Sequence, residues 1–126
     1  MLGTRGVVPV RSTILPTCAL AALLTMTAQA HTQLLQATPA DGSTVESPPR
    51  QLRLVFSEAA SLTALSIRKA GDATEKKIAP LPKQAAATFL IDLPPLTAGG
   101  YLVKWRALSD DNHLASGSIR FTLQAH

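Results

Sequence analysis

Cysteine is almost absent from this chain of 126 residues, and the only one, Cys18, lies among the first 30 residues. Residues 31–126 therefore cannot form a disulfide bond, so a hydrophobic core must hold them folded. A stretch of that length forms one domain. Aromatic residues make up 4% of the chain and charged residues 16%. Because the charges are dispersed and aromatics are scarce, the sequence gives no support to nucleic-acid binding.

Long apolar runs are also missing, since a membrane-spanning helix needs about 20 apolar residues. The apolar run Ile14–Met26 is shorter, follows two arginines and ends close to Ala28-Gln29-Ala30. These features are typical of a secretory signal peptide that is cleaved after Ala30. We therefore expect residues 1–30 to be removed on export to the periplasm, leaving residues 31–126 as one β domain without a membrane anchor. Because two arginines and no acidic residue leave with the signal, the net charge falls from +4 to +2.

Apolar and polar residues alternate along several segments, which is the period of β-strands, and no long segment has the period of a helix. In Tyr101–Ala107, for example, Trp105 faces one way while Lys104 and Arg106 face the other. Proline and glycine separate the segments, and such short, regularly spaced strands predict an all-β sandwich or barrel. One helical turn is expected at Ser57–Ser61. The other alternating segments are 52–56, 65–67, 89–93 and 119–123.

Cleavage after Ala30 would make His31 the first residue, with an α-amine and an imidazole that together form a two-nitrogen chelate. Asp111 and His113 lie two residues apart between predicted strands, and in extended backbone such residues project on the same side. In a sandwich, the start of the chain can lie beside such a late loop. Three nitrogens and one carboxylate oxygen suit Cu(II), and because the nitrogens must lose protons to bind, acid should weaken the site. The spacing alone is equally compatible with an ordinary solvated loop.

Two separated segments resemble the CopC family of periplasmic copper-resistance proteins. The first contains, in order, His31, Leu34, Pro39, Asp41-Gly42, Val45, Pro48-Pro49, Leu52, Leu54 and Phe56-Ser57-Glu58. The second contains Trp105, Ser109, Asp111, His113, Gly117, Phe121 and Leu123. The resemblance implies a Greek-key β-barrel or sandwich of about seven strands, with immunoglobulin-like or cupredoxin-like topology. It also implies one Cu(II) per chain, bound by His31, Asp111 and His113.

The resemblance further implies a role in copper homeostasis and resistance. The protein would sequester copper in the periplasm or carry it to an inner-membrane copper transporter of the CopD type. The family usually has glycine between the aspartate and the histidine, whereas this chain has Asn112, the non-glycine residue that best tolerates a left-handed backbone. Some members carry a methionine-rich loop for Cu(I), but Met1 and Met26 both lie in the expected signal. This chain is therefore expected to bind Cu(II) only.

No catalytic nucleophile, paired carboxylates or phosphate-binding loop is visible, so we expect a monomeric binding protein and not an enzyme. Two alternatives stay open: a copper oxygenase that uses an N-terminal histidine, and a metal-free immunoglobulin-like interaction module, in which His31 and His113 would lie apart. His126 ends the chain, where residues are more often disordered than bound to a metal. Glu58 is expected at a solvent-facing strand end. The side chains expected in the core are Tyr101, Trp105 and Phe121.

Overall fold

β-strands form all the regular elements of the computed structural model, which describes residues 32–125, and the longer strands alternate buried with exposed side chains. The seven strands are β1 (Leu34–Thr38), β2 (Ser43–Val45), β3 (Gln51–Lys69), β4 (Lys76–Lys77), β5 (Ala86–Asp92), β6 (Gly99–Ser109) and β7 (Leu114–Leu123). Residues 32–125 contain no helix, and so none that could cross a membrane. The predicted all-β class and strand number are confirmed.

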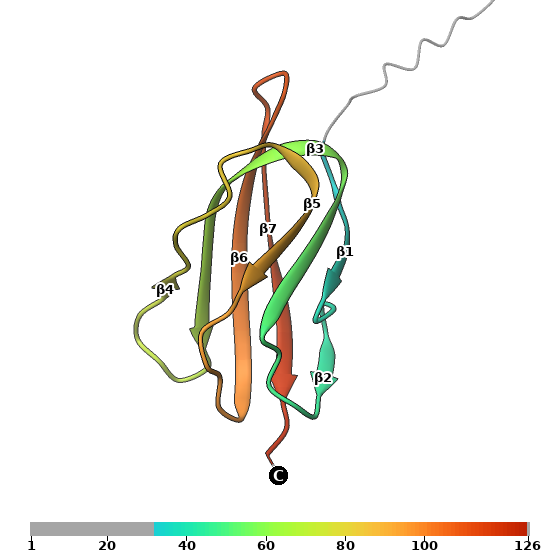
Figure 1. The fold of residues 1–126 in the computed structure, drawn as a ribbon. Coiled ribbons are helices and arrows are strands. Elements are labelled where there is room, and N and C mark those ends of the chain that lie inside the picture. The colour runs from blue at the N-terminus through green and yellow to red at the C-terminus, as the bar shows by residue number, and fades with distance from the viewer. Residues whose placement is uncertain (1–31, 126) are drawn as a thin grey trace, which may run out of the picture.

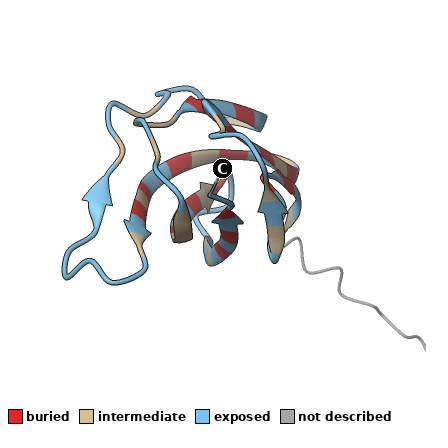
Figure 2. Cartoon of the chain, turned by 90° about the horizontal axis from the view of Figure 1, so that it is seen from below, coloured by how far each residue is buried: buried red, intermediate tan, exposed pale blue. Residues whose placement is uncertain are grey.

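The long strand β3 organises one curled sheet (Figure 1). Its first half pairs with β1 and β5, and its second half pairs with β4 and β6, all antiparallel. The antiparallel hairpin of β6 and β7 extends the sheet, and β2 joins β7 in parallel. Seen from below, the strands that carry the buried residues curve around a common interior (Figure 2).

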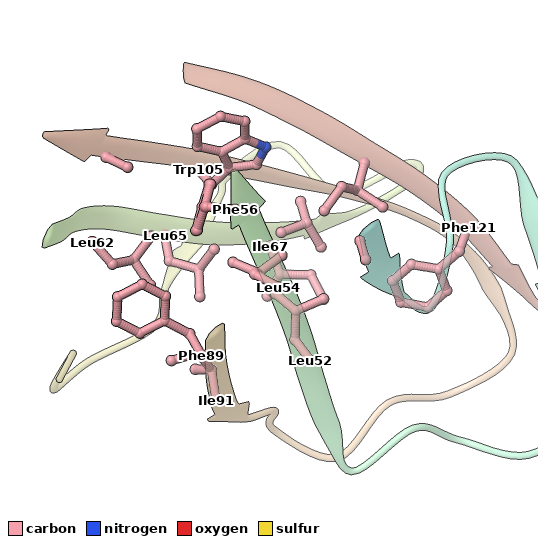
Figure 3. Close-up of a cluster of buried hydrophobic side chains, with 14 of the residues drawn as sticks. Leu52, Leu54, Phe56, Leu62, Leu65, Ile67, Phe89, Ile91, Trp105 and Phe121 are labelled. Carbon is pink, nitrogen blue, oxygen red and sulfur yellow. The ribbon is translucent and has the colours of Figure 1, made fainter. Parts of the chain in front are cut away.

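This interior holds one hydrophobic core (Figure 3). Trp105 is 6% exposed and meets Phe56 edge to face, with ring centroids 5.2 Å apart. Tyr101 stacks on Phe121 at 5.4 Å, and both are buried. Fully burying an aromatic or aliphatic side chain of this size stabilises the fold by about 1.5–3 kcal/mol. The core positions predicted for Tyr101, Trp105 and Phe121 are confirmed.

The helical turn predicted at Ser57–Ser61 is wrong, because β3 continues through these residues without a break. Here the strand changes partners from β1 and β5 to β6, with irregular pairing on either side of Ala60. The pairing of both halves of β3 overrides the local helical preference of the segment. Glu58 lies half-buried within this crossing, so its predicted place at a strand end is also wrong.

Candidate metal centre

The loop between β6 and β7 is a tight hairpin turn. The Asn112 N–H donates to the Ser109 carbonyl oxygen at 3.0 Å, and the Ser109 N–H donates to the His113 carbonyl oxygen at 3.0 Å. Asn112 has a φ of 66°, in the left-handed region that most side chains avoid. The prediction that asparagine tolerates this backbone in place of glycine is confirmed.

The side chains of Asp111 and His113 meet on one side of this turn. Nδ1 of His113 lies 3.0 Å from Oδ2 of Asp111. The buried Ser109 hydroxyl donates to Oδ1 of Asp111 and accepts a hydrogen bond from the His113 N–H at 3.2 Å. The Ser109 hydrogen bond, and after it that of His113, lowers the pKa of the Asp111 carboxyl. The turn therefore presents an ionised carboxylate beside an imidazole.

The predicted proximity of Asp111 and His113 is confirmed, but the predicted cause is wrong. Residues 110–113 are not extended strand, and the turn with its left-handed Asn112 brings the two side chains together. Sequence reasoning missed the part played by Ser109. A serine at the start of a turn commonly bonds to groups further along it, and this was the available signal. Both side chains are exposed, 62% for His113 and 49% for Asp111, so a dissolved ion can reach both.

The described start of the chain lies at the same end of the molecule as the β6–β7 turn (Figure 1). Ser57 on β3 holds Gln33 twice: its N–H donates to the Gln33 carbonyl oxygen at 2.8 Å, and its hydroxyl accepts from the Gln33 N–H at 2.9 Å. Thr32 is buried. Residues 32–34 and 114–118 line one cavity of about 500 Å³, so the chain start lies beside the strand that begins directly after His113.

Trp105 lines the cavity that the chain start shares with the first residues of β7. Its indole lies against Gly117 on β7, where a Cβ would come within 2.8 Å of Cζ2. Glycine at 117 is therefore required by the close approach of the ring. The indole Nε1 is buried, and residues 32–125 supply it with no hydrogen-bond partner.

The structure brings together two of the three predicted ligands. Within residues 32–125, no group of three His, Cys, Asp or Glu side chains could hold a metal ion. His31 and His126 both lie outside the described residues. β7 runs from the turn toward the opposite end of the molecule (Figure 1). Its ten residues span roughly 30 Å, so the described chain ends far from Asp111.

Comparison with known proteins gives the same family over nearly all of the described residues. The CopC domain family matches residues 34–124. The chain is 32% identical over 111 residues to copper resistance protein C of Pseudomonas syringae pv. tomato, covering 81% of this chain and 87% of that protein. It is 30% identical over 107 residues to copper resistance protein C of Escherichia coli, covering 77% and 84%.

Two solved structures share the fold. CopC from Methylosinus trichosporium OB3b superposes with a TM-score of 0.65 at 27% identity, covering 76% of this chain and 96% of that chain. PcoC, a methionine-rich copper resistance protein from Escherichia coli, gives 0.56 at 31% identity, covering 75% and 100%. Family match, relatives and fold agree, and the chain therefore belongs to the CopC family of copper resistance proteins.

Proposed function

We propose that this chain is exported, loses residues 1–30, and binds one Cu(II) ion through His31, Asp111 and His113. The observation that carries the proposal is the Asp111–His113 pair, held in a hydrogen-bonded turn that leads directly into the strand beside the described start of the chain. Thr32, the first described residue, shares a cavity with Leu114, the residue that directly follows His113. A free amine and imidazole on His31, the preceding residue, would complete a set of three nitrogens and one oxygen.

The donor types favour Cu(II) over Cu(I). A carboxylate and an imidazole are hard-to-borderline ligands that suit a tetragonal Cu(II) site. Residues 32–125 contain neither cysteine nor methionine, the soft ligands that Cu(I) prefers. The Escherichia coli relative of known structure is described as methionine rich, and this chain differs from it in that respect.

Asp111 and His113 are exposed, which supports a protein that takes up and releases copper rather than an enzyme that uses copper to modify a substrate. All five aromatic residues of the described chain are buried, so this part of the protein offers no flat aromatic surface for a polysaccharide. The carboxylate of Asp111 would also occupy a position that an oxygenase needs free. We therefore assign a periplasmic, non-catalytic, monomeric role: copper is sequestered or passed to an inner-membrane transporter of the CopD type.

A Cu(II) competition titration on exported protein, with its first residue verified by mass spectrometry, tests the ligand set. His113→Ala should weaken binding by more than the roughly hundredfold that loss of an outer hydrogen-bond partner can cost, because it removes a ligand. Asp111→Asn should weaken it by about tenfold or more. Asp110→Asn changes a neighbouring exposed carboxylate of the same turn and should leave binding unchanged. Equal affinity of His113→Ala and the native protein would refute the proposal.

A further inference from the structure

One solvent face of the curled sheet is basic. It belongs to the second half of β3, to β6 and to β7, and its side chains alternate with buried residues such as Val103. In the pairing register, Arg68, Leu102 and Arg120 form one cross-strand row. Lys104 and Arg106 follow along β6 toward the metal-site turn, and all four cations are exposed. Glu75 forms an ion pair with Lys104 on this face, and Asp41 accepts a hydrogen bond from the backbone N–H of Arg120.

The basic face is hollowed by a groove of about 800 Å³. Lys104 and Arg106 of β6 line it, together with Ser116 and Ser118 of β7 and Lys77 of β4. Alanine, serine and glycine occupy several of the positions around the two long cations, and such small side chains leave the space open. The groove, which Ile78 and Leu81 also line, therefore combines positive charge with room for an extended chain.

The groove already holds one carboxylate of the protein itself. Glu75 Oε1 lies 2.8 Å from Lys104 Nζ, and Glu75 Oε2 accepts a hydrogen bond from the Ser66 hydroxyl at 3.4 Å. Lys104 lowers the pKa of Glu75, as expected for a carboxylate stabilised by a cation. A cation and a serine hydroxyl on neighbouring strands thus bind a carboxylate in this groove.

The next cross-strand row also contains a cation and a serine, but no acidic side chain of the described chain binds the cation. Arg106 pairs with Ser116 on β7 and with Ala64 on β3, one row nearer to the metal-site turn. Among residues 32–125, no carboxylate forms an ion pair with the Arg106 guanidinium. A guanidinium can bind a carboxylate through two parallel hydrogen bonds, so this row offers a ready position for one.

We propose that this groove docks an extended acidic segment of a partner protein, with one carboxylate on Arg106. The cations line a hollow, which an acidic peptide enters and a flat membrane surface does not. Trp105 and Gly117 line both the groove and the cavity at the chain start, so a docked partner lies beside the candidate metal centre. Docking of the acidic segment does not require copper. Exchange of copper between the docked partner and the metal centre rests on the proposed function.

Titration of ¹⁵N-labelled exported protein with a capped peptide of alternating Glu and Ala tests the proposal at low salt. We expect saturable shifts at the amides of Lys104, Arg106, Ser116 and Ser118, and none with the matching Lys–Ala peptide. Arg106→Gln should weaken binding by about fivefold, the effect of losing one exposed ion pair. Arg106→Lys should recover part of it. Arg53→Gln, which removes an exposed arginine from the other half of the sheet, should change nothing.

The groove proposal fails if the acidic peptide does not bind, if Arg106→Gln binds as well as the native protein, or if the shifts lie elsewhere. It also fails if vesicles containing phosphatidylglycerol bind the basic face while the peptide does not, because the face would then meet a membrane. A Cu(II) titration of the same samples separates the two proposals. Protein that binds copper but no peptide refutes only the groove, and protein that binds peptide but no copper refutes only the copper site.

Discussion

Ser109 connects the Asp111 carboxylate to the backbone N–H of His113 through one buried hydroxyl. Ser109→Ala removes the largest cause of the lowered Asp111 pKa, so that carboxyl should titrate at higher pH by ¹³C NMR. Because the folded pKa is lowered, the associated stability is present above the ordinary value and is lost as pH falls through the folded value. Cu(II) affinity should fall by about tenfold, as for other outer partners of ligands. An unchanged Asp111 titration, with Ser118→Ala as control, would contradict this role.

Gly117 lies directly against the Trp105 ring, which leaves no space for a larger side chain. Gly117→Ala places a Cβ 2.8 Å from Cζ2 of the ring, which is buried in the core and cannot move freely. Overpacking of this kind costs about 1–3 kcal/mol, so thermal unfolding should occur at lower temperature. Ser116→Ala, the adjacent exposed position, is the control. Equal stability of Gly117→Ala and the native protein would mean that the ring does not require glycine.

At the scale of elements, β1 is fixed at its start by the two hydrogen bonds between Gln33 and Ser57. Ser57→Ala removes the side-chain acceptor, whose hydrogen bond contributes about 1 kcal/mol. A less firmly held chain start should lower Cu(II) affinity up to about tenfold, while the melting temperature falls by only about 4–8 °C. Thr63→Ala, at another exposed position of β3, should have no effect on copper. A large loss of stability with unchanged Cu(II) affinity would show that the hydrogen bonds between Gln33 and Ser57 stabilise the fold and do not contribute to copper binding.

The longer strands were predictable because each shows several cycles of alternation, as in Tyr101–Ala107. The shortest ones, β2 with three residues and β4 with two, are too short to show a period. The unbroken course of β3 was not predictable either, since its alternation shifts between Leu62 and Leu65, where its pairing with β6 is irregular. The extended backbone of Ser57–Ser61 depends on the strands that pair with β3 on either side of it, and these strands are far away in the sequence.

The candidate site was predictable to a similar extent. Asp111, His113 and the tolerance of Asn112 for a left-handed backbone followed from local chemistry and from the family resemblance. The contact between Gln33 and Ser57 joins residues 24 positions apart, and no local pattern signals such a hydrogen bond.

For the whole molecule, a ligand that binds only the folded state stabilises it by about 2.7 kcal/mol at a free concentration of 100 times Kd. In a domain of about 100 residues, this corresponds to a rise in Tm of roughly 10–20 °C. Calorimetry at pH 7 should show this rise with Cu(II). At pH 4 the rise should disappear, because amine and imidazole nitrogens bind metal only after losing their protons. An equal rise at both pH values would contradict binding through these nitrogens.

The most direct test of the copper site compares two exported proteins, one that begins at His31 and one with a single glycine before it. The extension moves the α-amine away from the His31 imidazole and leaves residues 32–125 unchanged. A Cu(II) competition titration should show one tightly bound ion in the first protein and binding weaker by orders of magnitude in the second. Equal affinity of the two forms would contradict the N-terminal chelate, and with it the proposed copper site.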